Sequence, residues 1–157
     1  MFLMNLCIRI IIAIGGPDDE AAVDRYTRCT LVHEEATRQS VDPYLALAVA
    51  WEESRFEDIR SPKGAVGPMQ VIPKWWCEDI NDCDHIEAGV KALATFRRLH
   101  PKSLPKALCH YNGGNKCFKR GETYARMVMK RLSFIKRLER KLKAQVDCDT
   151  QVRNCDR

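Results

Sequence analysis

Hydrophobic and polar positions divide the chain into helical segments separated by loops rich in Gly and Pro. Pro17, followed by acidic residues at 18–20, is typical of a helix start, because Pro fits the first turn and carboxylates favour the positive end of the helix dipole. We expect this helix to run to about Ser40. Asp42 then predicts the cap of a second helix. Its segment LALAVAW is apolar on nearly all sides, which predicts a buried central helix.

Three more helices are predicted in the second half of the chain. Asp84 can cap a helix that continues to about residue 99, before Pro101. Residues 104–111 predict a short helix stopped by the Asn-Gly-Gly sequence at 112–114. A final helix is predicted from about 122 to 144, with apolar residues on one face and cations on the other.

Residues 57–73 lack a helical period and contain three Pro and two Gly, which predicts a structured loop or a short hairpin. The only run that could form an extended strand is Met69–Ile72. The fold class predicted is therefore mainly α, in a single lobe, with at most a short β-hairpin or irregular loop.

The first sixteen residues, MFLMNLCIRIIIAIGG, have the length of a signal-peptide core and end in small residues. The cationic start is missing and Arg9 interrupts the apolar run, so a buried N-terminal helix or strand is the alternative. We expect a possible signal or anchor segment at 1–16, a catalytic domain at 17–144 and a Cys-containing tail at 145–157. If the segment is removed, Cys7 leaves with it and seven cysteines remain.

Eight cysteines are present, and none of their spacings forms a CxxC pair. This density favours an oxidising compartment, periplasmic or extracellular, over a set of buried free thiols. Cys77 and Cys83 bracket a short acidic loop, and Cys109 and Cys117 bracket the Asn-Gly-Gly turn. Each of these two pairs could close a small loop by a disulfide.

Composition and charge narrow the class of protein. The chain has 157 residues, 45% of them hydrophobic, with a mean hydropathy of −0.37, which suits one globular domain and excludes disordered and polytopic membrane proteins. The net charge is +5, and residues 119–143 alone carry ten Lys or Arg against two Glu. This cationic segment either attracts the anionic cell envelope or is an ordinary solvated face. Nucleic acid is not an expected partner, because no reading motif accompanies the charge.

The candidate chemistry begins where the apolar helix ends in Glu52 and Glu53. A carboxyl there faces a low-dielectric wall and the negative helix pole, and both raise its pKa, as a general acid for glycosidic bond cleavage requires. The two positions differ by about 100° around the helix, so one alone can face a cleft. The alternative is that both are solvated helix-end residues.

Four motifs in order make the sequence similar to the SLT-type lytic transglycosylases, over roughly residues 41–131. Glu53-Ser54 resembles the catalytic Glu-Ser pair of that family, and SPKGAVGPMQVIP resembles its glycine-rich Met-Gln segment. The sequence His110-Tyr111-Asn112-Gly113-Gly114 resembles its Ala-Tyr-Asn-x-Gly motif. Tyr124 stands where the family has a late tyrosine.

The resemblance implies a lysozyme-like helical fold and cleavage of the β-1,4 bond between N-acetylmuramic acid and N-acetylglucosamine in peptidoglycan, without metal or cofactor. Glu53 would protonate the leaving oxygen and then accept the proton of the muramyl C6 hydroxyl, which attacks C1 and gives a 1,6-anhydro product. The acetamido group of the substrate would stabilise C1, so no second carboxylate is needed. A lysozyme-like hydrolase and a non-catalytic peptidoglycan-binding envelope protein remain alternatives. A monomer is expected.

The remaining site residues follow from the resemblance and have ordinary structural alternatives. Ser61 would bind the acetamido group, or cap a turn. Met69 and Gln70 would line the sugar subsites, although an apolar Met is often in the core. Substrate contacts are also implied for Ser54, for Tyr111 and Asn112 on the far wall of the cleft, and for Tyr124 beside Glu53. Pro68 and His110 depart from the residues that the family has at their positions.

Overall fold

The computed structural model describes residues 2–15 and 20–150, and these form seven helices. Their bounds are α1 Phe2–Gly15, α2 Glu20–Arg38, α3 Pro43–Ser54, α4 Pro73–Trp76, α5 His85–Leu99, α6 Leu104–Gly113 and α7 Lys119–Thr150. The described residues contain no β-strand, and the mainly α fold class in a single helical domain is confirmed.

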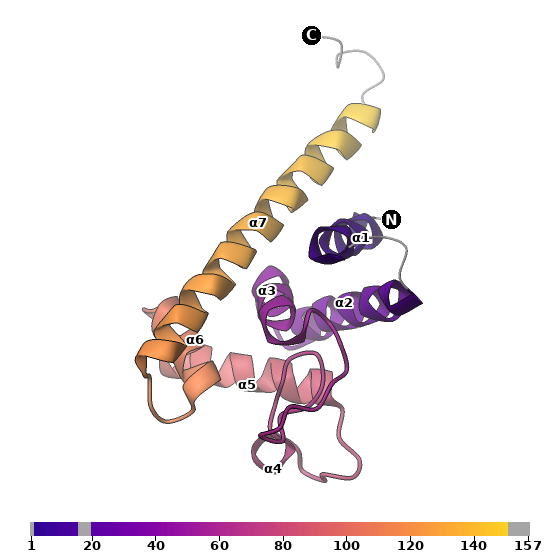
Figure 1. The fold of residues 1–157 in the computed structure, drawn as a ribbon. Coiled ribbons are helices and arrows are strands. Elements are labelled where there is room, and N and C mark those ends of the chain that lie inside the picture. The colour runs from indigo at the N-terminus through magenta and orange to yellow at the C-terminus, as the bar shows by residue number, and fades with distance from the viewer. Residues whose placement is uncertain (1, 16–19, 151–157) are drawn as a thin grey trace.

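Helix α3 is central, as its apolar sequence predicted. Its seven residues from Leu45 to Trp51 are all buried. Asp42 caps the helix, since its carboxylate accepts hydrogen bonds from the backbone N–H groups of Tyr44 and Leu45 at 2.9 and 3.3 Å. Helices α2 and α7 pack against α3 on different sides (Figure 1). This packing buries α3 almost completely and fixes the position of its C-terminal end.

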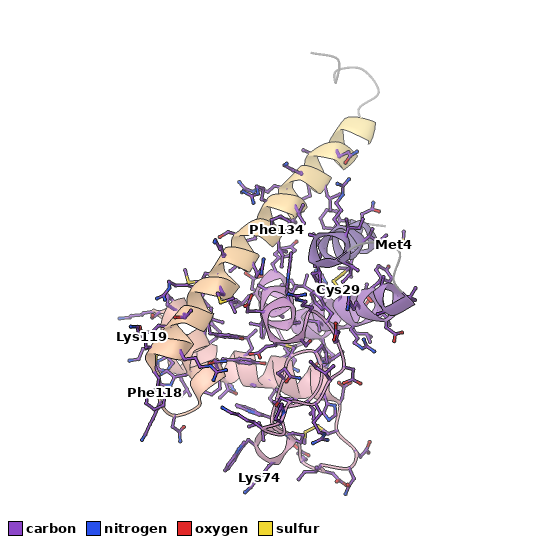
Figure 2. The ribbon with its side chains drawn as sticks, viewed as in Figure 1. Met4, Cys29, Lys74, Phe118, Lys119 and Phe134 are labelled. Carbon is purple, nitrogen blue, oxygen red and sulfur yellow. A yellow bond between two sulfur atoms is a disulfide. The ribbon has the colours of Figure 1, made fainter. Side chains whose placement is uncertain are left out.

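Helix α1 is part of the core. Leu6, Cys7 and Ile10 have no exposed surface, and a disulfide joins Cys7 to Cys29 of α2. Figure 2 shows sulfur between the two helices at the Cys29 label. The N-terminal segment is thus a helix with one buried face, and its expected role as a signal or anchor segment stays a prediction. Among the described residues, none of the helices combines the length and hydropathy that crossing a bilayer requires.

Helix α7 begins earlier and ends later than the range of 122–144 predicted. It begins beside α6, runs past α3 and then beside α1, and its C-terminal end projects beyond the rest of the fold (Figure 1). The early start follows from Phe118, whose carbonyl already accepts the backbone N–H of Glu122 at 3.1 Å. The predicted tail from 145 onward is helical as far as residue 150, and the rest of it lies outside the described residues.

The loop between α3 and α4 carries the residue pairs that come closest to a β-hairpin. Val66 forms isolated antiparallel bridges with Arg60 and with Val71. The strand-like run Met69–Ile72 thus contributes one bridge and no named strand, within the short hairpin or irregular loop expected. The short helix α4, which the sequence did not predict, follows this loop directly.

Candidate active site

The C-terminal end of α3 is turned sharply by two residues in the left-handed backbone region. Arg55 and Phe56 have φ values of +57° and +64°, which non-glycine residues seldom adopt. The backbone N–H of Arg55 bonds the Trp51 carbonyl at 3.0 Å, and the Phe56 side chain is fully buried. Arg28 of α2 donates to the Phe56 carbonyl at 3.3 Å. These contacts hold a strained turn immediately after Glu53.

Glu52 and Glu53 point to different partners, as the helical angle between them predicted. The Glu52 carboxylate accepts a hydrogen bond from Arg131 Nε of α7 at 3.3 Å. The guanidinium of Arg131 also lies 4.8 Å from the ring centroid of Trp51. Glu52 is therefore held in an ion pair with α7, whereas the ion pairs of the described residues leave Glu53 out.

Burial raises the pKa of Glu53 from an ordinary 4.5 to about 7. The hydroxyl of Tyr124 opposes this change by stabilising the carboxylate, and the negative charge of Glu52 adds to it. Glu53 remains partly exposed to solvent. The group is thus both desolvated and reachable from solvent.

Two tyrosines of α6 and α7 lie in the same surroundings as Glu53. Burial, followed by the negative charge of Glu53, raises the pKa of both Tyr111 and Tyr124 well above the ordinary range. The Tyr111 hydroxyl donates to the Met69 carbonyl at 2.8 Å. The Tyr124 hydroxyl is close enough to affect Glu53, but no hydrogen bond of ordinary length and angle satisfies it among the described residues. It is therefore a buried polar atom whose neighbour is the Glu53 carboxyl.

Ser54 links α3 to the glycine-rich loop. Its side chain is buried, and its hydroxyl donates to the Pro68 carbonyl at 2.8 Å. This bond places the loop against the end of α3, next to Glu53. The structure thus gives Ser54 a structural contact, and its contact with substrate stays a prediction.

Ser61 and Gln70 make hydrogen bonds inside the loop. Ser61 Oγ accepts the backbone N–H of Ala65 at 3.0 Å, in the turn-capping role that was its alternative. Gln70 Nε2 donates to the carbonyls of Ile59 and Gly67 at 2.9 and 3.0 Å. These bonds fix the shape of the loop, and the predicted sugar contacts of both side chains remain predictions.

Met69 has a fully buried side chain, so its thioether belongs to the core. A Cβ added at Gly89 of α5 would lie 2.6 Å from the Met69 Cβ, so the loop packs on α5 at a position that only Gly allows. Asn112 lies exposed near the end of α6. The predicted contact of Met69 with a sugar stays a prediction, and its carbonyl accepts the hydrogen bond of Tyr111.

Both disulfides predicted from the sequence are present. Cys77 is bonded to Cys83 in the connection between α4 and α5, and Cys109 is bonded to Cys117 between α6 and α7. The second bridge closes the loop that follows Tyr111 and Asn112. Helix α6 continues to Gly113 instead of stopping at Tyr111, because Gly114, with φ +64°, ends it and bonds the His110 carbonyl at 2.7 Å.

Sequence reasoning missed the role of Arg131. A signal existed, since Tyr124 and Arg131 are seven residues apart on one helix and therefore share a face. If Tyr124 faces the end of α3, Arg131 faces the same helix about two turns further on. From the sequence, Arg131 counts only as one of the ten cations of residues 119–143.

An apolar pocket of about 340 Å³ lies elsewhere, between α1 and α2, and shares no residue with the candidate site. It is lined by Met4, Ile8, Ile11, Ile12, Ala22, Val23 and Tyr26. Within the described part of the chain, no group of three or more His, Cys, Asp or Glu could hold a metal ion.

The fold and the site together define a helical domain with one desolvated carboxylic acid at the end of its central helix, flanked by two tyrosines. The family model of the transglycosylase SLT domain matches residues 30–134, and the chain belongs to this family. No curated protein and no solved structure matches the chain. Membership in the family indicates an enzyme that cleaves the glycan strands of peptidoglycan.

Proposed function

We propose that the protein is a lytic transglycosylase that cleaves the bond between N-acetylmuramic acid and N-acetylglucosamine, with Glu53 as its single acid and base. The observation that carries this proposal is the desolvated Glu53 carboxyl, whose pKa of about 7 suits both the gain and the loss of a proton near neutrality. Glu52 is unsuited to the role because its carboxyl group is engaged by Arg131 of α7.

In the first step, protonated Glu53 gives its proton to the glycosidic oxygen as the bond between this oxygen and C1 breaks. The acetamido group of the same muramyl residue stabilises the positive charge on C1, in the manner of substrate-assisted glycosidases. In the second step, the Glu53 carboxylate accepts the proton of the C6 hydroxyl while the oxygen of this hydroxyl bonds to C1. Glu53 ends protonated again, and no water is consumed.

Tyr124 supports both steps in this proposal. Its buried hydroxyl has no satisfied bond of ordinary geometry, and it lies beside Glu53. A hydroxyl there stabilises the carboxylate formed in the first step and orients it for the second. Tyr111 is fixed by its bond to Met69 and supplies a firm wall on the opposite side.

We also propose that the enzyme works outside the cytoplasm, periplasmic or extracellular, where its substrate lies. The three disulfides of the described residues support this location, since such bonds persist in oxidising compartments.

The test is mass spectrometry of the muropeptides released from purified peptidoglycan by the wild type, Glu53→Gln and Glu52→Gln. We expect 1,6-anhydro products from the wild type and from Glu52→Gln, and none from Glu53→Gln. Products heavier by one water would establish a hydrolase instead. Release of nothing by any of the three proteins, with binding of peptidoglycan retained, would identify a binding protein. Equal release by Glu53→Gln and wild type would exclude Glu53 as the acid.

A further inference from the structure

Three basic side chains lie close together, one at the C-terminal end of α5 and two on α6. The imidazole rings of His100 and His110 are stacked, with centroids 4.6 Å apart and planes at 18°. His110 Nδ1 lies 2.8 Å from the Gly114 carbonyl oxygen, so this nitrogen carries the proton and donates. Lys106 stands one turn before His110 on α6 and acts electrostatically on His100. We call His100, Lys106 and His110 the basic cluster.

The basic cluster lies in a stretch of chain without any carboxylate. Residues 88–121 contain eight Lys or Arg and no Asp or Glu. Within the described residues, Lys91 is the only one of these eight with an ion pair, a 4.0 Å contact with Glu78. In contrast, three cations of α7, Arg131, Lys136 and Lys143, are paired with acidic residues. The basic cluster is therefore not neutralised by the protein itself.

The charges of the basic cluster oppose one another. Burial lowers the pKa of His100, and the positive charges of His110 and Lys106 lower it further. Arg97, the remaining cation in contact with His100, donates to its carbonyl at 3.3 Å. Like charges held together without a counterion are destabilising, and a bound anion removes this repulsion.

The basic cluster adjoins the wall of the candidate active site. His110 precedes Tyr111 directly, and the ring of Phe96 lies between the two, 6.5 Å from His110 and 6.3 Å from Tyr111. The loop that joins α6 to α7, which ends near Phe118 and Lys119 (Figure 2), belongs to the same stretch of sequence without carboxylates. A long substrate that contacts Tyr111 would therefore pass next to the basic cluster.

We infer that the basic cluster binds the carboxylates of the peptide stems that hang from the glycan strand being cleaved. This inference rests on the proposed function, because the strand must lie along Tyr111. Peptide stems supply free carboxylates at regular intervals along a strand whose sugars carry no other anionic group once the stem is attached. The basic cluster would thus favour strands whose stems keep free carboxylates over strands whose stem carboxylates are blocked.

The test compares two forms of the same peptidoglycan, one intact and one whose stem carboxylates have been converted to neutral amides. We expect Lys106→Glu to lower kcat/KM on intact strands about threefold to tenfold, the range of one exposed charge contact reversed in sign. Cleavage of the amidated strands should stay at the wild-type rate. Lys141→Glu, at an exposed position far along α7, makes the same change in net charge and should affect neither substrate.

A binding measurement tests the inference without relying on cleavage of the substrate. The titration of the His100 ring, followed by NMR, is compared with and without a soluble muropeptide that carries a tripeptide stem, and with the same muropeptide whose stem carboxylates are amidated. We expect only the muropeptide with free stem carboxylates to raise the pKa of His100, because a carboxylate stabilises the imidazolium. His100→Gln should remove the resonance and weaken binding of the stem-bearing muropeptide.

The outcomes separate this inference from the proposed function. If the wild type cleaves both substrates and Lys106→Glu cleaves both equally well, the inference is wrong and the proposed function stands. If the wild type cleaves neither substrate, the proposed function fails, and the NMR titration alone decides the inference. If only added lipopolysaccharide shifts the His100 titration, the basic cluster binds envelope phosphates, and the inference is overturned.

Discussion

At the scale of residues, the candidate site depends on the cost of placing one carboxyl in apolar surroundings. Glu53 has a pKa of about 7 in the folded protein against an ordinary 4.5. Because the raised pKa belongs to the folded state, that state binds the proton more tightly than the unfolded chain does. The free energy of unfolding therefore falls as the pH rises from about 4.5 to about 7.

We predict that Glu53→Gln stabilises the protein above neutral pH while it abolishes cleavage. The amide never ionises, so the variant avoids a penalty on the order of 2–3 kcal/mol at pH 8, and gains almost nothing at pH 4. Thermal unfolding at both pH values measures the difference. An equal change of Tm at pH 4 and pH 8 would show that Glu53 is not held protonated by its surroundings.

Glu52 affects the pKa of Glu53 through its negative charge. We predict that Glu52→Gln lowers the pKa of Glu53, because the substitution removes the negative charge that helps to raise it. The acid form of Glu53 is then lost at lower pH, so the alkaline limb of the kcat/KM profile moves to lower pH while the plateau below it is kept. An unchanged profile would contradict the electrostatic coupling of the two residues.

At the scale of elements, α6 and α7 approach each other most closely at Gly121. A Cβ added there would lie 2.7 Å from Cys109 Sγ and 2.9 Å from the Cys109 carbonyl oxygen, too close for any neighbour to remain in place. Tyr124 stands one turn further along α7. The contact that lets α7 lie against α6 therefore also sets the distance from Tyr124 to Glu53.

We predict that Gly121→Ala lowers both stability and activity. The methyl group forces α7 away from α6, at a cost of about 1–3 kcal/mol, and moves Tyr124 away from the acid. Gly113→Ala is the matched control, since a Cβ at this helical position meets nothing within 4 Å. Urea unfolding and kcat/KM of both variants give the comparison. Equal behaviour of the two variants would contradict the close approach.

Helix α1 contributes to the fold through its covalent bond to α2 as well as through burial. The Cys7–Cys29 bridge closes a loop with a sequence separation of 22 residues. We predict that Cys7→Ser with Cys29→Ser lowers the free energy of unfolding by about 3 kcal/mol, the size expected for a loop of this length. The measurement is urea unfolding under non-reducing conditions. No loss of stability would show that α1 adds little to the fold.

The sequence predicted the elements whose signals are local. The caps at Asp42 and Asp84 and the apolar run of α3 each mark a helix by contacts within a few residues, and all three are confirmed. The burial of Met69 and the pairing of Arg131 depend instead on which elements meet in space. Gly89 and Gly121 mark two places where elements approach closely. Their neighbours in the sequence do not indicate this, because the contact is made with a distant part of the chain.

At the scale of the whole molecule, charge is divided between a cationic stretch and an acidic connection. Residues 88–121 lack carboxylates, whereas residues 77–87 contain five carboxylates and no Lys or Arg. This uneven distribution places positive charge and negative charge in different parts of the surface, and the net charge of +5 does not reveal that separation. Surface binding through the cationic residues of 119–143 remains a separate prediction, and part of that charge is taken up by ion pairs.

The contact between α1 and α7 joins the two ends of the described chain. Lys143 lies 5.9 Å from the ring centroid of Phe2, although the two are separated by nearly the whole sequence. Contacts between such distant segments form late, because a long loop must close first. A chain emerging from a ribosome or a translocation channel therefore holds α1 without α7 until residues 119–150 have been made. Tyr124 is also made well after Glu53, so Glu53 acquires its complete surroundings only once α7 has packed on α3.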